Sequence, residues 1–543
     1  MPDEDKMNLG KIYHMGKEEA AGLILNRQAM ASHTFITGST GTGKSNAVYH
    51  LLDEITKNGQ TTFLVVEPAK GEYKNVFGNC TDVQVFGTNP RETPLLRMNP
   101  FAFPENIHIL EHIDRLVEIF NACWPMYAAM PAVLKDAIER SYQKVGWDLR
   151  NSESEKGVFP TFFDLLDILP GVIEESHYSK DTQSDYVGAL CTRVKSLTNG
   201  IYGSVLCAED ALTDEALFDR NVIVDLSRVG SMETKSLLMG ILVMKLQEYR
   251  MCSSGMNSRL RHVTVLEEAH NLLRKTSAGQ SQEGANLQSK SVEMLANAIA
   301  EMRTYGEGFI IADQAPGLLD MSVIRNTNTK IILRLPDEED RKLVGKSAAL
   351  KEAQIDELSK LPLGVAAVYQ NEWPEAVLCK IEAYPMPENA VYHKPSKMPH
   401  EINAEFVFGQ LAVGKELEPL SSSEMEQLKL WLKRHETVLK PEDSRYLERV
   451  FAGGELDVAK TRKAVFDFFG GIGTVVDYCA AAKKSLTPRK EFLEQLQGQY
   501  GLKAAAADWV LNSVISMGMS LNPDAKAVDN LRTNFEQQGG RVL

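Results

Sequence analysis

The sequence lacks any apolar run of the ~18 residues that a membrane-spanning helix needs, so no membrane span is predicted. Its first residues, MPDEDKMNLG, are polar and acidic, so no secretory signal is expected. The apolar content of 43% and the charged content of 24% are typical of globular domains. Together these features predict a cytoplasmic protein with cores large enough to fold.

The chain also lacks paired cysteines. Its seven cysteines are scattered, and none of them forms a C-x-x-C pair. Neither a zinc site nor a disulfide framework is therefore expected. The simplest interpretation is that the cysteines are reduced thiols in a cytoplasmic protein.

Basic residues are not in excess. The chain has 59 Lys and Arg against 73 Asp and Glu, which gives a formal net charge of −14. This balance excludes a protein that wraps nucleic acid with a uniformly basic surface. It does not exclude a ring that is acidic outside and basic in its channel, because electrostatic attraction is local in salt.

Small residues are concentrated in one stretch that resembles a phosphate-binding loop. The stretch fits G-x-x-x-x-G-K-[ST] and lies between an apolar strand, HTFIT, and a helical pattern that closes at Asn58-Gly59. Its glycines let the backbone N–H groups point inward, and the helix N-terminus adds partial positive charge. Lys44 would reach the β and γ phosphates of ATP, and the Ser45 hydroxyl would bind Mg²⁺. The nucleotide-binding residues predicted here are Gly38, Ser39, Thr40, Gly41, Thr42, Gly43, Lys44 and Ser45.

Acidic residues follow two further predicted strands. The strand from Thr62 to Val66 ends in Glu67, and the strand from His262 to Leu266 ends in Glu267 and Glu268. The carboxyl ends of parallel strands collect functional side chains at one edge of a sheet. We therefore assign Glu267 to the metal, Glu268 to the attacking water, and Glu67 to the nucleotide. A solvated strand-end carboxylate remains the alternative for Glu67.

Three other polar residues are candidates for the catalytic step. Gln314 follows a strand from Phe309 to Ala312 and could sense the γ-phosphate without adding charge. Arg303 precedes that strand, and Arg334 lies inside a predicted strand from Lys330 to Leu335. An arginine can stabilise charge on the transferred phosphoryl group from its own chain or from a neighbour. Each arginine could equally be an ordinary surface cation, although the pair favours a finger supplied by a neighbouring subunit.

At this point the chain resembles the HerA/FtsK superfamily of ring-shaped P-loop translocases, and HerA-like ATPases in particular. The resemblance rests on an ordered series from about residue 10 to 345: GKIYHMG, GSTGTGKS, VVEPAKGEYKNV, RMNPFAF, VIVDLSRVGSMETKSLLMGIL, VLEEAHNLL, RTYGEGFIIADQAPGLLD and IRNTNTKIILRLPDEEDRKL. It implies a hexameric motor that uses ATP and Mg²⁺ to move double-stranded DNA through a pore. It also implies that Gln314 is the polar sensor and Arg303 the preferred trans finger, with Arg334 the second choice.

The resemblance carries further expectations about partners. Proteins of this kind commonly work with a nuclease, and in antiphage operons they pair with nuclease or sirtuin-type effectors. HerA-type proteins usually carry an N-terminal β-barrel, and only 37 residues precede the loop here, so we expect the barrel to be absent or left out of this chain. The alternative function is a scaffold that does not translocate and in which ATP controls assembly of an effector complex.

The predicted fold is α/β, with a RecA-like P-loop core on a mostly parallel sheet, a helical insertion and a C-terminal helical domain. A polar loop from Arg274 to Lys290 follows the paired acids, and its Arg274, Lys275 and Lys290 are candidate contacts to DNA phosphates. A surface loop without this function is the alternative. The expected organisation is residues 1–103 for the N-terminal segment and first part of the core, 104–210 for the insertion, 211–384 for the rest of the core, and 385–543 for a strap and helical domain.

Overall fold

The computed structural model describes residues 2–57, 59–127, 129–154, 157–208, 210–275, 282–386, 390–394, 428, 441–451, 457–484, 487–500, 504–522, 524–540 and 542. The chain divides into two compact units. Unit 1 comprises Met1–Ser154 and Phe159–Lys394, and unit 2 comprises Glu155–Val158 and Pro395–Leu543. Each unit is described by itself.

Unit 1 is built on an 11-stranded sheet with the order β2-β1-β13-β12-β11-β3-β10-β9-β4-β8-β5. The strands from β11 to β5 in this order are parallel, and the four at the other end are antiparallel. The predicted α/β fold with a mostly parallel sheet is confirmed. The strand bounds are β1 Lys6–His14, β2 Lys17–Asn26, β3 Thr34–Thr37, β4 Thr62–Glu67, β5 Val83–Gly87, β8 Asn221–Asp225, β9 His262–Glu267, β10 Glu307–Asp313, β11 Thr329–Ile332, β12 Val365–Gln370 and β13 Val377–Ile381.

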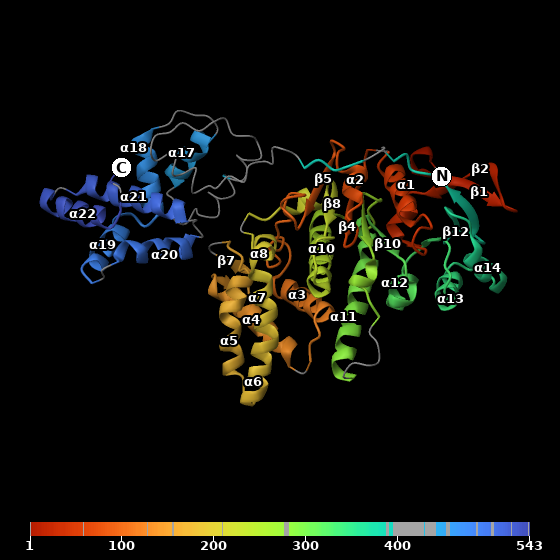
Figure 1. Ribbon diagram of the computed structural model, residues 1–543, viewed down its shortest axis with the longest axis horizontal. Coiled ribbons are helices and arrows are strands. Elements are labelled where there is room, and N and C mark those ends of the chain that lie inside the picture. Colours follow the sequence, from red (N-terminus) through yellow and green to blue (C-terminus); the bar gives the residue numbers. More distant parts are fainter. Residues whose placement is uncertain are drawn as a thin grey trace. The chain divides into compact units, whose positions relative to one another are not determined.

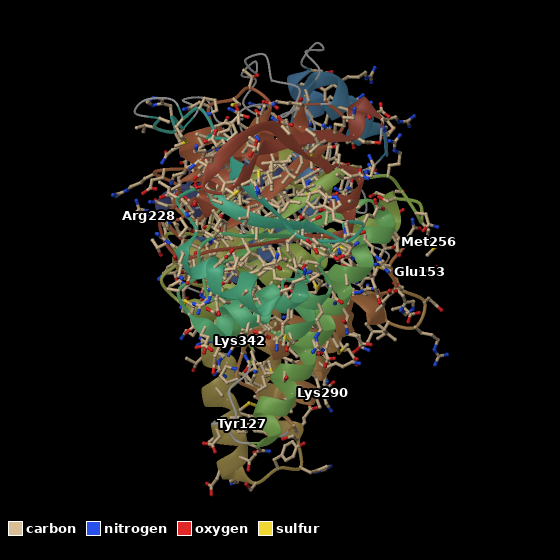
Figure 2. The ribbon with its side chains drawn as sticks, turned by 90° about the vertical axis from the view of Figure 1, so that its right-hand side faces the viewer. Tyr127, Glu153, Arg228, Met256, Lys290 and Lys342 are labelled. Atoms are coloured by element: carbon tan, nitrogen blue, oxygen red, sulfur yellow. The ribbon has the colours of Figure 1, made fainter. Side chains whose placement is uncertain are left out.

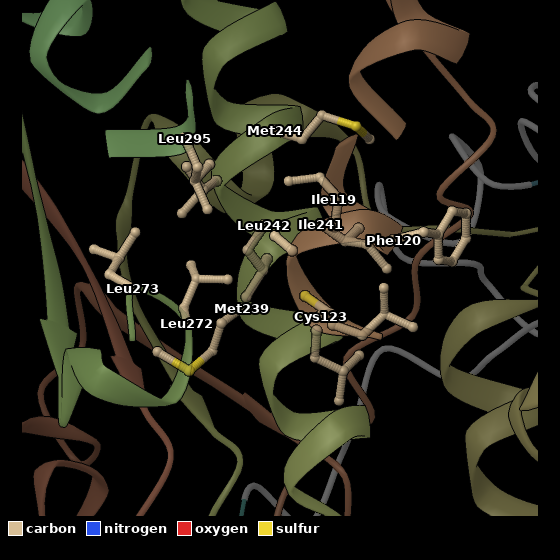
Figure 3. Close-up of a cluster of buried hydrophobic side chains, with 14 of the residues drawn as sticks. Ile119, Phe120, Cys123, Met239, Ile241, Leu242, Met244, Leu272, Leu273 and Leu295 are labelled. Carbon is tan, nitrogen blue, oxygen red and sulfur yellow. The ribbon is translucent and has the colours of Figure 1, made fainter. Parts of the chain in front are cut away.

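Helices cover both faces of the sheet, because the central strands carry apolar side chains on both sides. In β10, Ile310 and Ala312 face one core, whereas Phe309 and Ile311 face the other. The first core includes α1 and α2, and the second includes α3, α10 and α11. Figure 3 shows part of this second core, where side chains of α3, α10 and α11 meet Leu272 and Leu273. The bounds are α1 Lys44–Thr56, α2 Tyr73–Phe77, α3 Ile109–Cys123, α10 Met232–Ser253, α11 Gln282–Glu301, α12 Met321–Arg325, α13 Glu338–Ser347 and α14 Glu352–Glu357.

Most of the segment between β5 and β8 is helical. Figure 1 shows α4, α5, α6 and α7 grouped beside α3. The start of α5 is fixed by a capping box, in which the side chains of Thr161 and Asp164 satisfy backbone N–H groups. The bounds are α4 Met130–Lys144, α5 Phe162–Glu175, α6 Lys180–Tyr186, α7 Thr192–Thr198, α8 Gly200–Leu206 and α9 Asp214–Phe218, with a short hairpin of β6 Trp147–Asp148 and β7 Glu153–Ser154.

Unit 2 is helical in its described residues and has its own core, which includes Phe469, Tyr478 and Leu511. Helix α20 begins at Pro488, in agreement with the preference for proline in the first turn of a helix. No single helix in the described ranges is long and apolar enough to cross a bilayer, although the bent pair α18–α19 passes by length and composition alone. The bounds are α17 Pro441–Phe451, α18 Val458–Phe468, α19 Gly471–Ala482, α20 Pro488–Tyr500, α21 Ala504–Leu521 and α22 Ala525–Gln537.

A buried ionic network joins the amino-terminal ends of β9 and β10. The Glu307 carboxylate accepts hydrogen bonds from His262 Nδ1 at 2.7 Å, Arg250 Nε at 2.8 Å and Thr264 Oγ1 at 2.8 Å. Burial alone would raise the pKa of Glu307, but His262 and Arg250 outweigh it and lower the pKa to about 2. The stabilisation from Glu307 is therefore complete above the ordinary carboxyl pKa and is lost as the pH falls towards 2.

We expect Glu307→Ala to destabilise unit 1 by about 3–5 kcal/mol, because the fully buried Arg250 would lose a charged partner. Hydrogen exchange of β9 and β10 amides measures this loss as reduced protection. Glu338→Ala is the matched control, since Glu338 forms an exposed i,i+4 pair with Lys342 and such pairs contribute under about 1 kcal/mol. Equal protection in the two variants would contradict the prediction.

Candidate functional site

The loop between β3 and α1 has the shape of a phosphate cradle. Gly41 and Gly43 have φ values of 75° and 105°, a region that favours glycine, and Gly43 precedes the first residue of α1. A Cβ at Gly38 would lie 2.7 Å from both Leu333 Cβ and Thr42 Oγ1, so this close approach also requires glycine. The Thr42 hydroxyl donates to the Ser39 carbonyl at 2.7 Å, which closes the loop on itself. The glycines and this hydrogen bond therefore define the shape of the loop.

Lys44 joins this loop to the paired acids. Its Nζ lies 3.0 Å from Glu267 Oε2 and 3.2 Å from Glu268 Oε1, and its side chain is only 8% exposed. Burial alone would lower the pKa of Lys44, but the two carboxylates outweigh it and raise the pKa. The sheet register explains the contact, because Glu267 pairs with Ala312 of β10, the strand that also neighbours β3. The predicted convergence of the loop and the paired acids is present in the structure.

Glu268 has a left-handed backbone conformation, with φ 45° and ψ 52°, which few residues other than glycine adopt. The turn after β9 directs its carboxylate towards Lys44 while Glu267 completes the strand. A non-glycine residue in this region is strained, and such strain is concentrated at functional sites. The two neighbouring acids therefore reach one ammonium group from different backbone conformations.

Gln314 connects Glu268 to the phosphate loop. Its Nε2 donates to Glu268 Oε1, and its Oε1 accepts from the Thr40 hydroxyl at 2.5 Å. An ionised carboxylate can only accept, so the amide must present its NH₂ group to Glu268 and its oxygen to Thr40. The structure thus places the predicted sensor between the loop and the predicted catalytic acid.

His270 and Asp313 also lie beside Glu268, and neither residue was predicted from the sequence. The Asp313 Oδ2 atom accepts from the backbone N–H of His270 at 2.8 Å and lies 2.9 Å from His270 Nδ1. His270 Nδ1 is also 3.6 Å from Glu268, and its pKa is raised, chiefly by the hydrogen bond to Asp313. Donor atoms of Glu268, His270 and Asp313 lie within 4.8 Å of one another, so a divalent cation could also be held here. Asp313 could have been found, because it ends β10 at the same edge.

Glu67 is engaged with its own loop. Its two carboxylate oxygens accept the backbone N–H groups of Glu72 at 2.7 Å and Tyr73 at 3.1 Å. Burial raises the pKa of Glu67 to about 8, although these two hydrogen bonds oppose the shift. Glu67 therefore shapes the turn between β4 and α2, and its contact with a nucleotide stays a prediction.

The two candidate arginines lie at opposite ends of the parallel strands. Arg303 is exposed in the turn before β10, and the seven residues of β10 place it roughly 20 Å or more from Asp313 at the nucleotide edge. Arg334 was predicted inside a strand, and this is wrong: β11 ends at Ile332 because its neighbour β3 turns away into the phosphate loop. Arg334 is exposed beside that loop, and its carbonyl accepts the Ser39 N–H at 3.0 Å.

The predicted basic loop is shorter than expected. Arg274 and Lys275 are exposed and lie after the paired acids, whereas residues 276–281 are outside the described residues. Helix α11 begins at Gln282, so Lys290 is on a helix and not in the loop (Figure 2). The helix forms because Val292, Leu295 and Ile299 recur at helical spacing and are buried. Contact of these basic residues with DNA stays a prediction.

The donor set fits a magnesium nucleotide. Ser45 is the second residue of α1, and Glu267 is the last residue of β9. Their side chains offer the oxygen donors that Mg²⁺ prefers. Lys44 lies between the cradle and the acids, where a phosphate oxygen would compete with the carboxylates for its N–H groups. The site combines a phosphate cradle, a cation site and a second acid.

Comparisons with known proteins agree with this geometry. Residues 7–243 match the model of the family "Helicase HerA, central domain". The chain is 25% identical over 392 residues to the DNA double-strand break repair helicase HerA of Sulfolobus acidocaldarius, an alignment that covers 70% of this chain and 69% of that protein.

Solved structures of low sequence identity share the fold. VirB4 of Thermoanaerobacter pseudethanolicus has a TM-score of 0.53 and 18% identity, covering 71% of this chain and 98% of VirB4. The plasmid coupling protein TrwB in complex with the ATP analogue ADPNP has a TM-score of 0.50 and 14% identity, covering 73% and 99%. The solved structures share the fold, and the family model and the HerA helicase of Sulfolobus acidocaldarius support the interpretation of this chain as a HerA-like P-loop ATPase.

Proposed function

We propose that this protein is an ATP-driven motor that assembles into a ring and translocates double-stranded DNA. The observation that carries the proposal is the convergence of Lys44, Glu267, Glu268 and Gln314 at the carboxyl edge of the parallel sheet. The relative from Sulfolobus acidocaldarius supports DNA as the substrate, since it is a DNA double-strand break repair helicase.

Each side chain of the site has a distinct role in the proposed hydrolysis. When bound, Mg²⁺ supplies charge neutralisation at the β and γ phosphates. Ser45 and Glu267 would hold the ion, and Lys44, which contacts Glu267 and Glu268, would bind phosphate oxygens. Glu268 accepts a hydrogen bond from the attacking water and orients it. Gln314 links the water-activating acid to Thr40 in the loop, so the amide can respond to the γ-phosphate.

The opposite-edge position of Arg303 supports a ring. Arg303 precedes the amino end of β10, whereas the nucleotide site is at the carboxyl end, so Arg303 is too distant to reach the nucleotide of its own chain. Its side chain is exposed and can contact a neighbouring subunit. A head-to-tail interface between copies of this chain would bring Arg303 to the next subunit's nucleotide, and such interfaces close into rings. We propose six subunits by analogy with ring translocases, with a nuclease or sirtuin-type effector as partner in a cytoplasmic antiphage system.

We expect double-stranded DNA to raise the rate of ATP hydrolysis by about tenfold or more, because translocation couples the two sites. The stimulation should decline steeply with salt, since contacts to phosphates release counterions. A steady-state ATPase assay with and without duplex DNA measures this effect, and displacement of a DNA triplex measures translocation. A scaffold would hydrolyse ATP equally with or without DNA, and that result would overturn the motor.

A further inference from the structure

A buried tyrosine holds the carboxylate that is proposed to bind the metal. The Tyr73 phenol donates a hydrogen bond to Glu267 Oε1, while Lys44 Nζ contacts the other oxygen, Oε2. Tyr73 is only 2% exposed. Burial, with the Glu267 charge second, raises the pKa of Tyr73 well above its ordinary value, so the phenol stays a hydrogen-bond donor. The two oxygens of Glu267 thus have different and fixed partners.

A second tyrosine lies beside the other proposed metal ligand. Tyr49 is on α1, one helical turn after Ser45, so the two side chains are neighbours on one face of the helix. The rings of Tyr49 and Tyr73 meet edge to face, with centroids 4.9 Å apart. Aromatic pairs prefer this arrangement, which restricts both rings. The packed pair therefore connects the helix face that carries Ser45 to the Glu267 carboxylate.

The backbone that carries Tyr73 is itself held in place. Glu67 accepts the Tyr73 N–H at 3.1 Å, and Asn75 Oδ1 accepts the Tyr392 N–H at 3.0 Å. Helix α2 is therefore attached to the end of β4 on one side and to residues 390–394 on the other. These contacts hold the backbone from which the Tyr73 phenol reaches Glu267.

We propose that Tyr73 is a positioning residue that sets the rotation of the Glu267 carboxylate for Mg²⁺, and that Tyr49 does the same for the Ser45 hydroxyl. The terminal torsion of a glutamate is broad, so the carboxylate needs an outside partner to select one orientation. Such partners of metal ligands are typically worth about 10- to 100-fold in metal affinity. The inference rests on the proposed function, because it deepens the role of the nucleotide site.

The test is Tyr73→Phe in the full chain, with binding of a fluorescent mant-ATP measured as Mg²⁺ is increased from an EDTA-treated start. We expect the Mg²⁺ concentration that gives half of the maximal tightening to rise about 10- to 100-fold. The affinity without Mg²⁺ should be unchanged, because Tyr73 does not contact the phosphate loop. Tyr49→Phe should shift the Mg²⁺ dependence in the same direction.

The matched control is Tyr142→Phe, which removes a buried phenol that donates to the Phe101 carbonyl among the helices that follow β5. It should leave the Mg²⁺ dependence unchanged. Tyr73→Phe behaving like this control, or weakening binding equally with and without Mg²⁺, would overturn the inference. If Tyr73→Phe does not fold, an unchanged Mg²⁺ dependence in Tyr49→Phe overturns it instead.

The proposed function fails in a different way. In that case the wild-type chain would bind mant-ATP with no dependence on Mg²⁺, or Lys44→Ala would bind it as tightly as wild type. A wild-type chain that needs Mg²⁺ and Lys44, together with an unaffected Tyr73→Phe, would leave the nucleotide site standing and remove only the role of the tyrosine.

Discussion

Glu268→Gln should keep ATP bound and lower the rate of hydrolysis by about 10²- to 10⁴-fold, the range that general acid–base catalysis contributes. The amide has nearly the same shape as the carboxylate, so Lys44 keeps its contact with Glu267 and the cradle stays formed. An amide is a poor proton acceptor and cannot activate the water. Binding and turnover are therefore expected to separate in this variant.

Two measurements on the same protein check this separation: mant-ATP affinity at saturating Mg²⁺, and phosphate release under saturating ATP. Lys44→Ala is the contrasting variant, since it should lose binding as well as turnover. Glu293→Gln is the matched control, because Glu293 is exposed on α11 and has no part in the site. Normal hydrolysis by Glu268→Gln would show that Glu268 is not the catalytic acid.

The core of the site could be predicted from the sequence because its signals are local. The glycine loop, Lys44 and Ser45 are contiguous, and each lies between a recognisable strand and helix. Glu267 and Glu268 end an apolar strand, and parallel strands end at a common edge. That rule predicts that Lys44 and both acids lie on the same side of the sheet, whereas their direct contact also requires β9 to be separated from β3 by β10 alone.

Other parts of the site depend on contacts between distant segments and could not be predicted. The end of β11 before Arg334 is set by where its neighbour β3 turns, which is a property of the partner strand. The hydrogen bond from Tyr73 to Glu267 joins residues 194 positions apart. The Glu67 carboxylate accepts the backbone N–H groups of Glu72 and Tyr73, a contact that its position at the end of a strand does not reveal. A strand-end acid can face the ligand or its own loop, and the sequence pattern is the same for both.

The edge of the sheet at which Arg303 lies decides how it can act. The nucleotide site is at the carboxyl end of β10, and Arg303 is in the turn that precedes the amino end. An arginine that stabilises the transferred phosphoryl group must reach it directly. Arg303 can do so only on a neighbouring subunit, whereas exposed Arg334 lies beside the phosphate loop of its own chain. The two arginines therefore predict different behaviour in mixed rings.

Arg303→Ala should lower ATP hydrolysis by about 10³- to 10⁵-fold, the usual contribution of an arginine finger, without loss of mant-ATP binding. Mixing it with Glu268→Gln subunits should restore part of the activity. In a randomly mixed ring, about one interface in four joins an intact Glu268 to an intact Arg303, because each site takes its finger from one neighbour. Arg334→Ala is the comparison, and if Arg334 acts within its own chain, mixing with Glu268→Gln cannot restore activity. Ring assembly measured by particle mass must be the same in all mixtures. Failure of the Arg303→Ala mixture to recover would then assign the finger elsewhere, since the opposite-edge position leaves Arg303 no route to its own nucleotide.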